Sequence, residues 1–178
     1  MWKILSSEEL VSSRWVSVAR EKVQLPNGIE IEDFYKVRVS DASAVIAITE
    51  DGKIILKSEY RHCYERELIE LPSGVFEPGE KDPLEVAKRE LFEETGYFSD
   101  DWVYLGGTIE NSAKLTNTIH LFMARKCKRV SEQHLDRTED ISVHVLPLKE
   151  AVEMVIDNRI CCNCTAQGIL RIARMMGV

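Results

Sequence analysis

Two neighbouring segments decide how this chain folds: Gly74-Val75-Phe76-Glu77-Pro78-Gly79-Glu80 and Arg89-Glu90-Leu91-Phe92-Glu93-Glu94-Thr95-Gly96-Tyr97. The first segment is rich in glycine and is expected to form a loop. The second places Glu90, Glu93 and Glu94 at i, i+3 and i+4, so on a helix their carboxylates share one narrow sector of the surface. Like charges this close repel unless a cation lies among them, and Mg²⁺ and Mn²⁺ prefer oxygen ligands of this kind. The pattern therefore predicts a site for a divalent cation.

The ends of the helix that carries these carboxylates can also be predicted. Asp82 is a good N-cap, Pro83 suits the first helical position, and Glu85 completes an Asp-x-x-Glu capping box. Gly96 supplies a left-handed C-terminal stop. Apolar residues at i, i+3 and i+7 are expected to face the core: Leu84, Ala87 and Leu91. A capped, solvated, Glu-rich helix is the alternative interpretation, which the glycine-rich loop upstream disfavours.

Together the segments resemble the signature of the Nudix hydrolases, Gly-x5-Glu-x7-Arg-Glu-U-x-Glu-Glu-x-Gly-U, where U is a bulky aliphatic or aromatic residue. Every fixed residue is present, but eight residues separate Glu80 from Arg89 where the family has seven. Because the N-cap sets the start of the helix, the extra residue is expected in the loop at Lys81. The spacing from Arg89 to Glu94 is then unchanged. In the family, a contact between Glu80 and Arg89 holds the loop against the helix, and the extra residue could alter this contact.

Further blocks are similar to the ADP-ribose pyrophosphatase branch of this family, and they cover the chain from about Trp15 to its C-terminus. They are Glu59 to Arg61, Glu70 to Gly74, Glu77 to Glu80, Leu115 to Asn117, Ile119 to Phe122 and Glu139 to Ile141. The resemblance implies hydrolysis of the diphosphate linkage of a nucleoside diphosphate sugar, with ADP-ribose yielding AMP and ribose 5-phosphate. Asn111-Ser112-Ala113 stands where ADP-ribose-specific members often have a proline, so GDP-mannose or UDP-glucose remains an alternative. A non-catalytic nucleotide sensor is a third alternative, disfavoured by the intact carboxylates.

The resemblance also implies the metal ligands. Mg²⁺, or alternatively Mn²⁺, would be held by Glu90, Glu94 and the backbone carbonyl of Ser73, with Glu93 assisting. The ions would neutralise phosphate oxygens and lower the pKa of a bound water, which attacks phosphorus. The expected cofactor is therefore a divalent cation.

Other residues receive catalytic and phosphate-binding roles by the same resemblance. A further carboxylate must orient or deprotonate the water, and Glu139 is expected to do so, with Asp136 as the alternative. Arg61 would hold a substrate phosphate. Glu93, Arg89 and Glu80 complete the expected catalytic set.

The nucleotide base is expected near the N-terminal region. In this branch a β hairpin pairs two subunits, and an aromatic residue followed five residues later by an arginine reaches the partner's nucleotide. Trp15 and Arg20 match that spacing, and an indole and a guanidinium suit a base and a phosphate. An equally supported alternative makes Trp15 a core or dimer-interface anchor. A homodimer is expected.

Composition limits the partners and the location. A net charge of -7 and a pI near 5.2 argue against a nucleic acid polymer as ligand. No apolar run of 18 residues is present, and the N-terminus lacks the apolar stretch of a signal peptide, so no membrane association and a cytoplasmic location are expected. Five irregularly placed cysteines fit a reducing compartment. Cys161-Cys162-Asn163-Cys164 lacks the second pair that a zinc site needs, and small residues leading into a helix are the simpler interpretation.

The expected fold class is α/β: a Nudix fold, an α/β/α sandwich with a mixed sheet, preceded by a small N-terminal antiparallel β appendage. Residues 1–40 would form the hairpin region used in dimerisation, and residues 41–178 the hydrolase domain. The hairpin pairs Trp15–Val23 with Ile29–Tyr35 across a Pro26-Asn27-Gly28 turn. Later strands are expected at 44–48, 54–57, 102–105, 119–124 and 143–147, and helices at 148–157 and 165–176, the last with Ala166, Ile169, Leu170 and Ala173 facing inward.

Overall fold

The computed structural model describes residues 1–178, which divide into two compact units. The first unit comprises residues 1–41 and 109–118, and the second comprises residues 42–108 and 119–178. No helix in either unit combines the length and the hydropathy that crossing a bilayer requires.

The first unit is built on a three-stranded antiparallel sheet in the order β1-β2-β3, with β1 at Lys3–Ser12, β2 at Ser17–Gln24 and β3 at Glu30–Arg38. The predicted hairpin is present as β2 and β3, and Gly28 adopts a φ of 85° in the turn between them. The sequence prediction omitted β1, because its stretch Ser6-Ser7-Glu8-Glu9 interrupts the apolar alternation. Every residue of β1 is exposed.

The segment 109–118 completes the first unit although it is distant from the sheet in sequence. The Val37 amide donates to the Lys114 carbonyl at 2.8 Å, and the Thr116 amide donates to the Val37 carbonyl at 3.2 Å. The Lys114 ammonium lies 5.2 Å from the centre of the Phe34 ring. No local pattern in the sequence indicated this pairing.

The second unit is organised around an eight-stranded mixed sheet with the central order β11-β5-β4-β10-β8, in which β6 pairs with β5, β7 with β4 and β9 with β10. Only β4 and β10 are parallel. The strands are β4 (Ala42–Thr49), β5 (Lys53–Arg61), β6 (Arg66–Glu70), β7 (Ser73–Val75), β8 (Tyr97–Phe98), β9 (Asp101–Thr108), β10 (Ile119–Arg129) and β11 (Ile141–Pro147). The short η1 spans His62–Tyr64.

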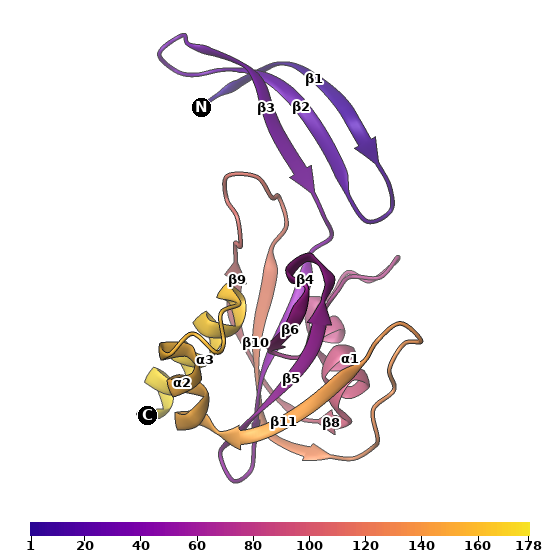
Figure 1. The fold of residues 1–178 in the computed structure, drawn as a ribbon, viewed down its shortest axis with the longest axis vertical. Coiled ribbons are helices and arrows are strands. Elements are labelled where there is room, and N and C mark those ends of the chain that lie inside the picture. The colour runs from indigo at the N-terminus through magenta and orange to yellow at the C-terminus, as the bar shows by residue number, and fades with distance from the viewer. The chain divides into compact units, whose positions relative to one another are not determined.

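Helices cover both faces of this sheet (Figure 1). Helix α1 (Pro83–Thr95) lies on one face, and α2 (Leu148–Ile156) and α3 (Asn163–Met176) lie on the other. Along β4, Val45 and Ala47 pack in the cluster that contains the apolar side of α1, while Ile46 packs in the cluster of α2 and α3. This alternation follows the two-residue period of a strand, and it produces the predicted α/β/α sandwich.

Most predicted elements are present within a few residues of their expected ends. One prediction about α3 is wrong: Leu170 is 41% exposed, and Ile172 is fully buried in its place. Ile169 and Ala173 are buried as predicted. The inward face of α3 keeps Ile169 and Ala173 but is shifted toward Thr165, Gly168 and Ile172, which are spaced three and four residues apart.

Candidate active site

Helix α1 presents the candidate site and begins and ends where the sequence predicts. The Asp82 carboxylate accepts a hydrogen bond from the Leu84 amide at 2.9 Å, and Gly96 closes the helix with a φ of 73°. The other half of the predicted capping box does not form, because Glu85 pairs with Lys88 at 2.8 Å instead. Lys81 precedes the N-cap, so the extra residue of the signature lies in the loop.

Arg89 ties the glycine-rich loop to the helix. Its guanidinium donates to both Glu80 carboxylate oxygens at 3.0 and 3.1 Å, to Glu90 at 2.7 Å and to Glu93 at 3.1 Å. Hydrogen bonding from Arg89 lowers the pKa of Glu80. The longer loop therefore retains the brace between Glu80 and Arg89.

The Glu90 carboxylate packs directly against Gly74, where any larger residue would displace it. Its side chain is buried, and burial raises its pKa above the ordinary range despite the adjacent Arg89. A Cβ atom on Gly74 would stand 1.9 Å from the Glu90 Oε1 atom. The signature glycine thus leaves the space that the Glu90 carboxylate fills.

Glu94 is the most buried carboxylate of the chain, at 2% exposure. Its Oε2 atom accepts from the Ser73 amide at 2.9 Å, and its Oε1 atom accepts from the Lys57 ammonium. Burial raises the pKa of Glu94 to about 7, against the opposing effect of Lys57. Strand β7 at Ser73 and helix α1 at Glu94 therefore meet through a charged contact.

Lys57 is a site residue that the sequence analysis did not single out. It lies on β5 with 1% exposure, and its ammonium also approaches Glu59 Oε2 at 3.3 Å and the Ser73 carbonyl at 3.5 Å. Residues at i, i+2 and i+4 of a strand share a face, so Lys57, Glu59 and Arg61 form a row of alternating charge. These alternating charges at every second position, directly after the apolar run Ile54–Leu56, were the sequence signal that could have identified Lys57.

Arg61 belongs to this row and is already paired. Its guanidinium contacts Glu59 at 3.1 Å and Glu70 at 2.6 Å. Burial disfavours its charge, but the neighbouring carboxylates, Glu70 first, raise the pKa of Arg61. The Cys162 thiol donates to the other Glu70 oxygen at 3.1 Å, and burial raises the pKa of that thiol to about 12.

The predicted site residues divide into three groups. In the first, Arg89 joins Glu80, Glu90 and Glu93, the Ser73 amide joins Glu94 on the same helix, and Arg61 reaches Glu94 through Glu59 and Lys57. Glu139, the second group, lies in a turn before β11, where its carboxylate accepts from the Asp136 amide at 2.9 Å. It is partly buried, while Asp136 is exposed.

Trp15 and Arg20, the third group, belong to the first unit. There the Arg14 guanidinium lies 4.2 Å from the Trp15 ring centre, and Arg20 pairs with Glu8 at 2.6 Å.

The donor atoms of this site are of the chemical type that a hard divalent cation prefers. They are carboxylate and carbonyl oxygens, which Mg²⁺ and Mn²⁺ prefer, and Glu90 and Glu94 are held close to the Ser73–Gly74 loop. No three of the acidic, histidine or cysteine side chains form a ready-made metal cluster. Arg89 and Lys57 place positive charge beside these carboxylates, so part of the repulsion from which the sequence predicted a divalent cation is offset by the protein itself.

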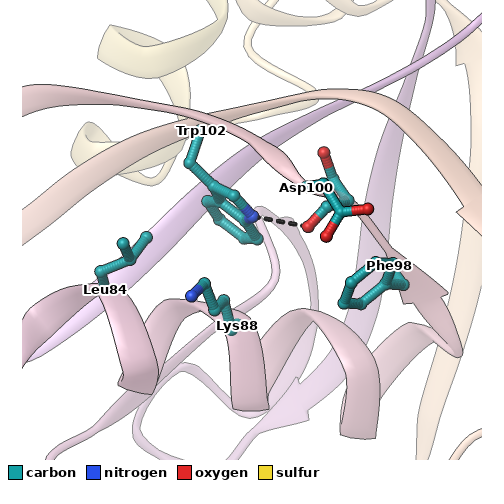
Figure 2. A pocket seen from close by; sticks show the side chains of 6 residues that line it. Leu84, Lys88, Phe98, Asp100 and Trp102 are labelled. Carbon is teal, nitrogen blue, oxygen red and sulfur yellow. Dashed lines mark hydrogen bonds between the residues drawn. The ribbon is translucent and has the colours of Figure 1, made fainter.

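A cavity of about 260 Å³ lies on the outer flank of α1 and contains none of the predicted site residues. Figure 2 shows Leu84 and Lys88 of the helix facing Phe98, Asp100 and Trp102. The Trp102 indole donates to the Ser99 carbonyl at 2.7 Å, which fixes the ring.

Comparisons with known proteins agree with the geometry. The family profile described as NUDIX domain matches residues 38–160, and the profile described as nucleoside diphosphate sugar hydrolase N-terminal domain matches residues 2–37. The chain is 35% identical over 159 residues to the methanol dehydrogenase activator of Bacillus methanolicus, covering 89% of this chain and 85% of the relative. It is 31% identical over 168 residues to the ADP-ribose pyrophosphatase of Bacillus subtilis (strain 168), covering 94% and 90%.

Two further similarities bear on specificity and fold. A GDP-mannose pyrophosphatase of Yersinia enterocolitica is 28% identical over 171 residues, covering 85% of each chain. A crystal structure of an ADP compounds hydrolase superposes with a TM-score of 0.83 at 21% identity, covering 99% of this chain and 94% of the other. The profiles, the relatives and the intact signature helix together place this chain in the Nudix hydrolase family, in its ADP-ribose pyrophosphatase-like branch of nucleoside diphosphate sugar hydrolases.

Proposed function

We propose that this enzyme hydrolyses ADP-ribose to AMP and ribose 5-phosphate in a reaction that requires Mg²⁺. The observation that supports this most is the burial of Glu90 and Glu94 against Ser73 and Gly74 of β7, which brings carboxylate and carbonyl oxygens of two elements close together. The similarity to an ADP-ribose pyrophosphatase over nearly the whole chain supports the substrate.

Mg²⁺ would be held by Glu90, Glu94 and the Ser73 carbonyl, with Glu93 assisting, and Mn²⁺ would serve as a substitute. When bound, the ions would neutralise the diphosphate oxygens and make the attacking water more acidic. Glu93 is suited to its supporting role because its side chain is 40% exposed and is held only by Arg89. Arg89 and Glu80 keep the loop and the helix in register.

Glu139 would orient the water or accept its proton, with Asp136 as the alternative. Glu139 is the better candidate because it is partly buried, while Asp136 is exposed. The hydrogen bond from the Asp136 amide holds the Glu139 carboxylate in place. One water adds to phosphorus as the phosphoanhydride bond breaks, so each turnover yields two phosphomonoesters.

Arg61 would hold a substrate phosphate. In the free enzyme its guanidinium is shared between Glu59 and Glu70, so a phosphate would have to compete with those carboxylates or use the remaining donors. Guanidinium groups bind phosphate through paired hydrogen bonds. The pairing with two carboxylates fixes the side chain in advance.

Trp15 and Arg20 would reach the nucleotide of the second subunit in a homodimer. Trp15 is 65% exposed, and a base would stack on the face of the indole that the Arg14 guanidinium does not cover. Arg20 is engaged by Glu8 and would have to exchange that carboxylate for phosphate. Residues 1–40 would then serve dimerisation and residues 41–178 hydrolysis, in a cytoplasmic enzyme.

A GDP-sugar or UDP-sugar is the second candidate substrate, and the similarity to a GDP-mannose pyrophosphatase favours GDP-mannose among these. The test is to incubate purified protein with Mg²⁺ and ADP-ribose, GDP-mannose or UDP-glucose, and to measure release of the nucleoside monophosphate. We expect the highest kcat/KM with ADP-ribose, and no release of nucleoside monophosphate once EDTA has chelated the Mg²⁺. Binding without hydrolysis of any substrate would identify a nucleotide sensor instead.

A further inference from the structure

The strongest unexplained feature of the site is a buried ammonium group among the proposed metal ligands. The Lys57 side chain is 2% exposed, and its Nζ atom is in contact with Glu94 Oε1. The same atom lies 3.5 Å from the Ser73 carbonyl oxygen. Lys57 thus occupies the neighbourhood of two oxygens that the proposed function assigns to a divalent cation.

The fold holds this ammonium in place. Lys57 is paired on one side with Glu70 of β6 and on the other with Val143 of β11, so its backbone is fixed between two strands. Ile55 and Leu56, which precede it, are fully buried. A buried charge must stay with a partner of opposite charge, and the Lys57 side chain, at 2% exposure, is paired with Glu94 and Glu59.

Arg89, the other cation of the site, is placed differently. Its side chain is 23% exposed and pairs with Glu90 and with Glu93, whose own side chain is 40% exposed. Mg²⁺ keeps several waters when it binds protein, so it needs a flank that is open to solvent. The site is open to solvent at Glu93, beside the buried Glu90, while the flank of Lys57 and Glu94 is closed.

We propose that the Lys57 ammonium is a built-in cation of this active site, standing in for one divalent ion at Glu94 and Ser73. The enzyme therefore binds one divalent ion fewer than its carboxylates alone would hold, and the remaining metal enters at the flank of Glu90 and Glu93. This inference rests on the proposed metal dependence. Lys57 acts as a positioning residue, since it holds Glu94 and the loop at Ser73.

The test is to count bound Mn²⁺ per chain from the electron paramagnetic resonance signal of the free ion, without substrate. Lys57→Met should bind one Mn²⁺ more than the wild type, because the ammonium no longer occupies Glu94. Lys57→Met/Glu94→Gln should return to the wild-type number. Lys53→Met is the matched control: it removes one positive charge from the same strand, at a side chain that is 46% exposed and pairs with Asp51, and it should bind the wild-type number.

The melting temperature, Tm, shows whether each variant is folded. Lys57→Met leaves a buried carboxylate unpaired and should have a lower Tm than the wild type without metal. An ion that binds only the folded state raises the Tm, so Mn²⁺ should raise the Tm of Lys57→Met more than that of the wild type. The double variant removes both charges and should show no such extra rise.

Equal numbers of bound Mn²⁺ in the wild type and in Lys57→Met would overturn this inference and leave the proposed function intact. An extra Mn²⁺ that persists in the double variant would also overturn it, since the ion would then lie elsewhere. If no variant binds Mn²⁺ and the wild type hydrolyses no substrate with Mg²⁺, both the inference and the proposed function fail.

Discussion

At the scale of single residues, the site depends on carboxylates that are buried and therefore need positive partners. Glu94 is almost completely enclosed and accepts from Lys57 and from the Ser73 amide. Removing the charge of one partner of a buried pair leaves the other uncompensated, which is costly. This makes Glu94 the most sensitive position of the helix.

Glu94→Gln should lower kcat by about 10² or more, by analogy with the loss of one electrostatic stabiliser. Glu90→Gln should have a slightly smaller effect. Steady-state kinetics at saturating Mg²⁺, with circular dichroism to verify the fold, measures both. Glu85→Gln is the control, because that side chain is exposed on the same helix and contacts only Lys88. Near wild-type turnover of Glu94→Gln would show that catalysis does not need the charge of Glu94.

Trp15→Ala should lose roughly 1–3 kcal/mol of substrate binding if the indole stacks the base. Stacking tolerates any base, so the KM should rise for ADP-ribose and for a GDP-sugar alike, while kcat changes less. Trp2→Ala is the control, since Trp2 is also exposed but packs edge-on against Phe34.

The oligomeric state of Trp15→Ala must be measured beside its kinetics. An unchanged KM in an intact dimer would show that Trp15 has a structural role and does not stack the base. A rise in KM that appears only when the dimer dissociates would mean that the residue acts through assembly.

At the scale of elements, the site is a junction between β7 and α1. The Ser43 hydroxyl of β4 donates to the Pro83 carbonyl at 2.8 Å and so fixes the start of α1 on the sheet. Gly74 of β7 pairs with Ser43, which brings the loop to the same place. The close approach of Glu90 to Gly74 therefore depends on two elements anchored at one point of β4.

Gly74→Ala tests this junction. The new Cβ would overlap the Glu90 carboxylate, so kcat should fall by about tenfold or more and stability by about 1–3 kcal/mol. Gly79→Ala is the matched control in the same loop: its φ of 100° strains any other residue, but nothing lies within 4 Å of the added atom. It should lose stability and keep kcat. Equal kcat for both variants would show that the Glu90 position tolerates displacement.

At the scale of the whole molecule, the first unit presents a strand with no covered side chain. All ten residues of β1 are exposed, including the apolar Ile4, Leu5, Leu10 and Val11. An edge strand of this kind offers unpaired backbone groups and apolar surface to a second copy. The predicted homodimer would cover it.

Light scattering should therefore give twice the mass of one chain at micromolar concentration. Leu10→Lys should weaken the dimer and reduce activity, whereas Glu9→Arg, a neighbouring change of charge on the same exposed strand, should have a smaller effect. A monomeric wild-type protein with full activity at high dilution would contradict both the dimer and the role of Trp15.

Features that depend on short-range spacing could be predicted from the order of the residues alone. The caps at Asp82 and Gly96, the shared face of Glu90, Glu93 and Glu94, and most strands and helices follow from helical or strand periodicity and from turn residues. These rules are local because a side chain's direction is fixed by its neighbours in the same element. The family signature added the expected ligands.

Only the tertiary structure decided which charges meet. Lys57 and Glu94 are 37 positions apart, and Cys162 and Glu70 are 92 apart. The segment 109–118 joins the first unit, and β1 extends its sheet, without any local signal strong enough to predict either. Such contacts depend on sheet order and on the burial that it creates, and burial is what makes an ordinary lysine an obligatory partner for a carboxylate.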